Sequence, residues 1–437
     1  MLPVTMKKTI FKTFFALCLC ILCVIGTCVS TFAAEFEKPE NIKACVVYNP
    51  DNQVTVYESW ANVRVSPGPT AKLMTAILAA ELLSSRMEDT VLVSAAMVSN
   101  VTGNTIGLKM GEHVRIRDML YAMLLTGAND AAQVLAITAC GSLDAFVAKM
   151  NARAAELGAE STKYETLTGL DLGAAKTTVT DTVTIALHAY SIPALAEIFE
   201  CASYTMPATD RADARELTTR NRFATPGDSY YYDGAKSFSF GSTTPSGYCM
   251  VVLARRASLS YLCVVLGAES AADLYRAGDK LLNYAFAEYK YKTILSPLDV
   301  VAELPVKNAQ SGQVTVSPAT SVSVYAQIEE EVASRMTLDV HLTDETLYAP
   351  LDEGTPVGYA DVYFDGACIA RVDLVTAYPM AQSQWLYFWF TVRQVLMTRG
   401  TLAVLILAAV AAGMGFLLAL RYRHRHIPHD DADLDAK

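Results

Sequence analysis

One lysine, Lys72, stands one turn into an apolar helical period that a Pro/Gly-rich turn introduces, in the stretch "VRVSPGPTAKLMTAILAAELL". An amine at this place can activate a hydroxyl three residues earlier, because residues three apart share a helix face. The residue three before Lys72 is Pro69, whose ring carries no nucleophilic oxygen. Proline is also a favourable first helical residue. The stretch is therefore explained as a turn and a helix start, without catalysis.

Two other hydroxyls lie near Lys72 in the sequence. Thr70 is two residues before the lysine, about 200° around a helix of about 3.6 residues per turn, and should point away from the amine. Ser66 is six residues before the lysine, beyond the turn-forming residues. Either hydroxyl could replace the missing nucleophile only if the backbone were shifted.

Two further stretches carry side chains that could bind a substrate. In "LLTGANDAAQVLA", Asn129 lies between two helical periods, and in "DGAKSFSFGSTTPSGYC", Lys236 and Ser237 lie on a predicted strand. The order and spacing of the three stretches resemble the serine D-alanyl-D-alanine carboxypeptidases, the low-molecular-weight penicillin-binding proteins, with their S-x-x-K, S-x-N and K-T-G motifs. The resemblance covers nearly the whole chain, including "GLKMGEHVRIRDMLYAMLL" before the second stretch.

The resemblance implies roles for the residues of the first two motifs. In that family the serine forms an acyl-enzyme and the lysine is its base. Lys72 therefore takes the base position, and Pro69 takes the nucleophile position with the serine lost. Gly127 takes the position of the second serine, which is also lost. Asn129 is expected to hydrogen-bond a ligand amide, and a helix-capping asparagine is the equal alternative.

The third motif is kept only in part. The resemblance places Lys236 and Ser237 at the substrate-binding Lys-Thr positions, and Phe238 at the position of the glycine. Because side chains alternate along a strand, Phe238 is expected to share a face with Lys236 and to crowd the cleft. A solvated strand lysine is the alternative for Lys236. The interval from Lys236 to Gly247 is a few residues longer than is usual in the family.

Charge and composition exclude several classes of function. The formal net charge is −10 and the sequence has no basic stripe, so a nucleic acid or another polyanion is a poor ligand. Neither a metal nor another cofactor is expected, because His113, His188 and His341 are too scattered for metal ligation. Six cysteines follow the predicted signal peptide, and none of them forms a CxxC pair. The sequence allows either disulfide bridges or buried free thiols.

Both ends of the chain predict a membrane protein. Residues 1–33 carry three lysines, the apolar run "FFALCLCILCVIG" and a small-residue cleavage site, which is typical of a secretory signal peptide. Residues 401–420 carry no charge and, at about 1.5 Å per residue, can cross a hydrocarbon layer of about 30 Å. Residues 381–400 are expected either to lie at the membrane interface or to extend the anchor. The signal peptide and "RYRHRH" place the tail, residues 421–437, in the cytoplasm.

Between the two ends the sequence predicts two domains. Residues 34–290 begin with the hairpin signal "ACVVYNP"/"VTVYES", continue with a block of helical periods and close with two buried strands and an amphipathic helix. This order predicts an α/β domain with an antiparallel sheet, and the resemblance implies a penicillin-binding/β-lactamase-like transpeptidase fold. Residues 291–380 alternate in short stretches, with a turn signal at Asp365-Gly366, and predict a small all-β domain.

Three hypotheses for the function follow. The first is a single-pass cell-membrane protein with an extracellular carboxypeptidase-like domain that acts in peptidoglycan metabolism without turnover, by binding the stem peptide or regulating cell-wall enzymes. The second is a working carboxypeptidase that trims stem peptides with Ser66 or Thr70. The third is a pure interaction protein with a filled cleft. Loss of a catalytic serine costs such hydrolases about a millionfold in turnover, which favours the first.

Overall fold

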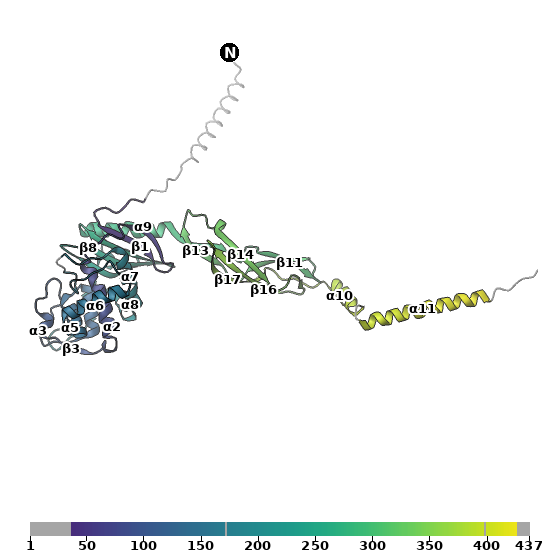
Figure 1. Ribbon diagram of the computed structural model, residues 1–437, viewed down its shortest axis with the longest axis horizontal. Helices are drawn as coiled ribbons and strands as arrows, with labels where there is room; N and C mark the ends of the chain where they lie inside the picture. The colour runs from purple at the N-terminus through teal and green to yellow at the C-terminus, as the bar shows by residue number, and fades with distance from the viewer. Residues whose placement is uncertain (1–35, 171–172, 397–398, 426–437) are drawn as a thin grey trace, which may run out of the picture. The chain divides into compact units, whose positions relative to one another are not determined.

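The computed structural model describes residues 36–170, 173–396 and 399–425. The predicted signal peptide lies outside the described residues. The chain divides into two compact units, and the boundary in the sequence falls between Tyr289 and Lys290 (Figure 1). Each unit is described by itself.

The first unit is built on a five-stranded sheet with the strand order β2-β1-β9-β8-β7. Every neighbouring pair in it is antiparallel, as the sequence predicts. The middle strands β8 and β9 are apolar and buried except near their ends, because both faces of the sheet are covered. The strands are β1 (Ala44–Asn49), β2 (Val54–Ser59), β7 (Ala235–Thr243), β8 (Gly247–Arg256) and β9 (Leu259–Ala268).

Helices cover the sheet and form a separate block beside it (Figure 1). Helix α9 packs closely on β8, and a Cβ atom added at Gly278 would lie 2.7 Å from the Met250 methyl carbon. Helix α2 is buried along almost its whole length at the centre of the block. The helices are α2 (Ala71–Leu82), α3 (Ala95–Val98), α4 (Ile116–Thr126), α5 (Asn129–Cys140), α6 (Leu143–Glu156), α7 (Val179–Ser191), α8 (Pro193–Phe199) and α9 (Ala271–Glu288).

Two short two-stranded sheets complete the first unit, and the sequence did not predict either. Strand β3 (Thr90–Leu92) pairs with β4 (His113–Arg115), and β5 (Ser203–Met206) pairs with β6 (Arg215–Thr218). They are three or four residues long, too short for an alternating pattern to be read in the sequence.

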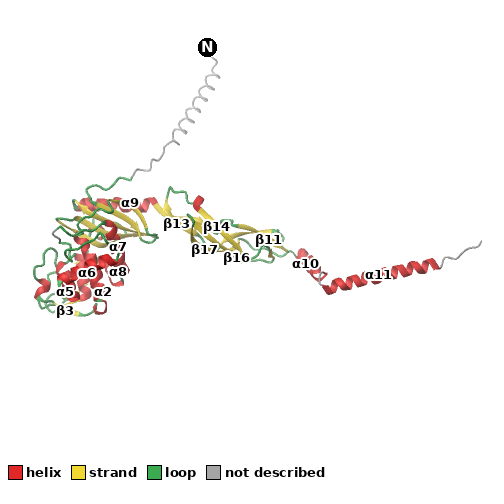
Figure 2. Cartoon of the chain, viewed as in Figure 1, coloured by secondary structure: helices red, strands yellow, loops and turns green. Residues whose placement is uncertain are grey.

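The second unit contains a six-stranded sheet and a two-stranded sheet, which agrees with the predicted all-β character (Figure 2). Asp365 and Gly366, with φ angles of 50° and 80°, form the predicted two-residue turn. The six-stranded order is β14-β16-β17-β12-β11-β15, and β10 pairs with β13. The strands are β10 (Tyr289–Leu295), β11 (Ala302–Lys307), β12 (Gln313–Pro318), β13 (Val322–Gln327), β14 (Met336–Leu342), β15 (Leu347–Tyr348), β16 (Pro356–Phe364) and β17 (Ala367–Thr376).

Two helices follow this unit, α10 (Gln384–Leu396) and α11 (Arg399–Arg425). Within α11, residues Ala403–Arg423 are long and apolar enough to cross a membrane, with a mean hydropathy of 2.6 and no burial. In the described part of the chain, two bent helix pairs, α5 with α6 and α7 with α8, also pass the length and composition test. Those four helices supply buried residues to the core of the first unit.

Candidate active site

The turn before α2 is pressed against the sheet. It is a short 3-10 helix, Gly68–Thr70, and Gly68 has a φ angle of +48°. A Cβ atom on Gly68 would lie 2.2 Å from the Ser246 hydroxyl, so glycine is required there. Ser239 of β7 donates its hydroxyl hydrogen bond to the Pro69 carbonyl oxygen at 3.1 Å. Pro69 is thus held between the start of α2 and the edge strand β7.

Lys72 lies one turn further along and points to a loop of the helical block. Its ammonium group donates a hydrogen bond to the Thr168 carbonyl oxygen at 3.1 Å. The next residue, Gly169, is so close to the turn that a Cβ atom there would overlap the Gly68 carbonyl oxygen, at 1.6 Å. Burial lowers the pKa of Lys72 to about 8, because the charged amine is poorly solvated. A pKa of about 8 lies in the range in which an amine can act as a general base near neutral pH.

The two neighbouring hydroxyls lie in the turn or before it. The Thr70 hydroxyl donates to the Pro67 carbonyl oxygen at 2.7 Å, inside its own turn, as its helical phase predicts. Ser66 is buried before the turn. Among the described residues, no serine or threonine hydroxyl forms a hydrogen bond with the Lys72 amine.

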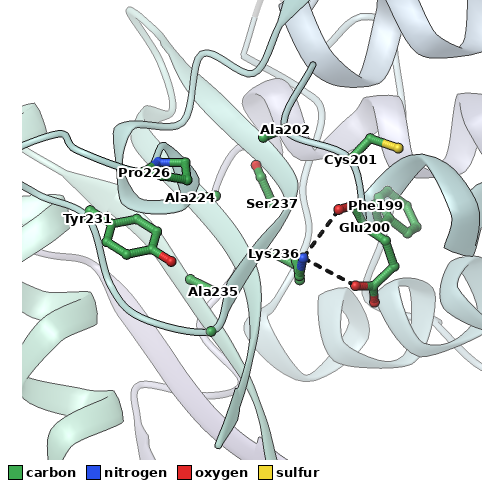
Figure 3. A pocket seen from close by; sticks show the side chains of 11 residues that line it. Phe199, Glu200, Cys201, Ala202, Ala224, Pro226, Tyr231, Ala235, Lys236 and Ser237 are labelled. Carbon is green, nitrogen blue, oxygen red and sulfur yellow. Dashed lines mark hydrogen bonds and ion pairs between the residues drawn. The ribbon is translucent and has the colours of Figure 1, made fainter. Parts of the chain in front are cut away.

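The structure does not bring Lys236 to this site. Its ammonium group donates to the Glu200 carbonyl oxygen at 3.2 Å and pairs with the Glu200 carboxylate at 3.4 Å (Figure 3). Both residues line a small pocket at the start of β7. The Ser237 hydroxyl accepts a hydrogen bond from the Asn221 side chain at 3.1 Å. The predicted substrate-binding pair therefore engages other residues of this unit.

The prediction that Phe238 crowds the cleft is wrong. Its side chain is 1% exposed and stacks on Phe199 at 4.1 Å between ring centroids, with Tyr190 on the same cluster at 5.4 Å. The physical reason is a β-bulge. The register of β7 on β8 shifts between Ser237 and Ser239, so Phe238 is an extra residue and the alternation of side chains is broken there.

The bulge brings Ser239 and Gly241 to Pro69 instead. A Cβ atom at Gly241 would lie 3.1 Å from the Pro69 Cβ, so the glycine lets the strand approach the turn. The sequence analysis missed both residues. The signal was the long interval from Lys236 to Gly247, because counting back from Gly247 leads to Gly241 as the glycine beside the nucleophile position.

The second motif lies at the junction of α4 and α5. Gly127 ends α4 with a φ angle of +73°, a conformation in which a serine would be strained. The side-chain nitrogen of Asn104 lies 3.3 Å from where a Cβ atom of residue 127 would be. No hydroxyl is present at this position, and a side chain there would be strained by the backbone conformation.

Asn129 is the first residue of α5, and the predicted capping role is wrong. Its side-chain nitrogen donates to the Thr102 carbonyl oxygen at 2.7 Å, and its backbone N–H donates to the Asn104 carbonyl oxygen at 2.7 Å. Asp130 fixes the same loop by accepting the backbone N–H groups of Ile106 and Leu108, each at 3.1 Å. The Asn129 side-chain oxygen is buried without a hydrogen-bond partner in the described residues.

Sequence comparison identifies the family to which this arrangement belongs. A sequence model described as D-alanyl-D-alanine carboxypeptidase matches residues 35–270, more than half of the chain. The chain belongs to the D-alanyl-D-alanine carboxypeptidase family. A second model, the C-terminal domain of penicillin-binding protein 5, matches residues 289–380.

Individual members of the family are similar over most of their length. The D-alanyl-D-alanine carboxypeptidase DacF of Bacillus subtilis is 25% identical over 84% of this chain and 95% of its own. The D-alanyl-D-alanine carboxypeptidase of Streptomyces sp. K15 is 28% identical over 61% of this chain and 94% of its own. Among solved structures, a D-alanyl-D-alanine carboxypeptidase of Mycobacterium tuberculosis has a TM-score of 0.53 at 27% identity, covering 58% of this chain and 95% of that one.

Each of the three motifs of this carboxypeptidase family is kept only in part. Lys72 stands without a serine, and Asn129 stands without a serine two residues earlier. On β7, Gly241 is at Pro69, but the residue two before it is Ser239 instead of a lysine. The lysine that the family would place there lies three residues earlier and pairs with Glu200.

Proposed function

We propose that this protein is a membrane-anchored member of the D-alanyl-D-alanine carboxypeptidase family that acts in peptidoglycan metabolism without acyl transfer, by binding the stem peptide or by regulating cell-wall enzymes. The observation that supports the proposal is Pro69 three residues before a lysine whose amine hydrogen-bonds a carbonyl oxygen. A nucleophilic serine attacks through an oxygen that proline lacks. The retained scaffold of the family is consistent with ligand binding.

The anchor is part of the same proposal. Residues Ala403–Arg423 form the apolar helix that would cross the membrane, and the predicted signal peptide would place both compact units outside the cell. The short tail that follows would then lie in the cytoplasm.

Reaction with a fluorescent penicillin tests the proposal. Full-length protein in detergent is expected to take up no covalent label, while a family member with an intact S-x-x-K motif is labelled in the same tube. A stoichiometric ester on this chain would overturn the proposal and favour a working enzyme with another nucleophile. Mapping the labelled peptide would then show whether Ser66 or Thr70 carries it.

The alternative of a pure interaction protein with a filled cleft loses its main support. That hypothesis relied on the Phe238 ring, which lies in the hydrophobic core with Phe199. Binding of a soluble stem peptide to the full-length protein would distinguish the two, because a filled cleft excludes it.

A further inference from the structure

A second pocket, of about 520 Å³, lies beside the segment that leads into the Pro67–Gly68 turn. Val65 and Ser66, which immediately precede that turn, line it, and so does Pro245 from the connection between β7 and β8. The pocket is therefore next to the nucleophile position without containing Pro69 or Lys72. Its volume lies within the range of about 300–1,000 Å³ that is usual for small-molecule sites.

The lining of this pocket is cationic. Lys43, Arg64 and Lys176 line it, and none of its nine described lining residues is acidic. The amines of Lys43 and Lys176 donate to the carbonyl oxygens of Pro245, at 3.4 Å, and Gly173, at 3.0 Å. Carbonyl oxygens orient the amines but do not neutralise them. Arg64 is exposed and forms no hydrogen bond or ion pair with the described residues.

An indole forms the wall next to these cations. Trp60 is 69% exposed, and its φ angle of +57° is in the left-handed region, which bulky residues rarely adopt. Strained backbone of this kind is held by its surroundings and is concentrated at functional sites. The neighbouring Val63 is also exposed, at 42%. The pocket thus combines a flat apolar face with an array of positive charges.

We propose that this pocket binds an acidic muropeptide, with a sugar ring on the Trp60 indole and a peptide carboxylate on Arg64 and Lys176. The inference rests on the proposed function and adds a binding site to it that lies outside the family motifs. The formal net charge of −10 repels long polyanions from the molecule as a whole. A compact ligand with one or two carboxylates avoids that repulsion, because surface charges are screened beyond about 8 Å at physiological salt.

Binding of a defined ligand to full-length protein in non-ionic detergent tests the site. The probe is a disaccharide-tetrapeptide, titrated by calorimetry. Two comparison ligands are titrated in the same way: the same compound with its carboxylates amidated, and inorganic phosphate. Arg64→Glu and Lys176→Glu are each expected to weaken binding about tenfold or more, because each replaces a charge-assisted contact with repulsion. Trp60→Ala should also weaken binding, because it removes the indole on which the sugar ring is proposed to lie. Lys149→Glu, an exposed lysine on α6 with the same charge change, is the matched control.

The outcomes separate the inference from the proposed function. Loss of binding in the three pocket variants and in the amidated ligand, with no loss in the control, supports the site. Unchanged binding in the pocket variants overturns the site and leaves the proposed function standing. Competition by phosphate as effective as that by the carboxylate ligand overturns the muropeptide assignment in favour of a general anion site. Absence of binding by the wild-type chain overturns the site together with the stem-peptide part of the proposed function.

Since the three side chains are exposed or half-buried, thermal unfolding should stay unchanged in all variants.

Discussion

Position 69 faces a lysine that retains the properties of a base. Burial lowers the pKa of Lys72 to about 8, and no described hydroxyl uses the amine. On the proposed function, the missing oxygen at position 69 is the first loss to test, at the 3-10 turn that leads directly into α2 and Lys72. The Pro69 Cβ already faces the strand edge at Gly241.

Replacing Pro69 with serine should restore slow acylation. Pro69→Ser puts a hydroxyl three residues before Lys72, as in the family motif, and is expected to react with fluorescent penicillin over hours, where the wild-type chain does not. The rate should rise between about pH 6 and about pH 9, because the amine accepts a proton only in its neutral form, which dominates above the pKa of about 8.

The double variant Pro69→Ser/Lys72→Met is the control for this gain. It should lose the label and the pH dependence together, because no base remains. Equal labelling of the single and double variants would contradict the role assigned to the lysine, and an unlabelled single variant would show that the missing serine is not the limiting defect.

At the scale of elements, the hydrophobic pattern predicted the long helices and the central strands, but not the course of β7. Helix α9 repeats apolar residues with a clear period, α2 and α4 are long apolar helices, and β8 and β9 are continuous apolar runs. A bulge adds one residue without leaving a mark in such a pattern. Two side chains expected on one face, Lys236 and Phe238, therefore separate into a surface ion pair and the core.

Substitution of Phe238 tests this placement through stability. Phe238→Ala removes a ring stacked between Phe199 and Tyr190 and should destabilise the first unit by about 3–5 kcal/mol. Thermal or denaturant unfolding of that unit would measure the loss, and Phe240→Ala, a half-buried ring on the same strand, should cost less. If the ring instead lay in the cleft, removing it would leave stability unchanged and improve stem-peptide binding.

For the molecule as a whole, the apolar helix near the C-terminal end was predicted from composition alone. A stretch of twenty uncharged residues is recognisable in the sequence because the hydrocarbon layer tolerates nothing else. The family could be recognised from the motifs in the sequence. The contacts around the nucleophile position, however, join three distant segments, around Pro69, Thr168 and Ser239. Contacts of this kind cannot be derived from local patterns alone.

Truncation at the C-terminal end should reveal two kinds of membrane attachment. Helix α10 has 13 residues and, at about 1.5 Å per residue, spans about 20 Å, less than the hydrocarbon layer of about 30 Å. It exposes a cluster of large apolar and aromatic side chains, which is typical of a helix that lies in the interface: Trp385, Leu386, Tyr387, Phe388, Trp389 and Phe390.

A chain ending at Met380 is therefore expected in the soluble fraction, and a chain ending at Leu396 should sediment with membranes but leave them under alkaline carbonate. The full chain should resist that extraction, because a helix that crosses the bilayer is removed only by detergent. Trp385→Ser/Trp389→Ser in the chain ending at Leu396 should return it to the soluble fraction, since the aromatic rings supply the interfacial contact. Equal solubility of the chains ending at Met380 and Leu396 would show instead that α10 gains its membrane contact only as an extension of α11.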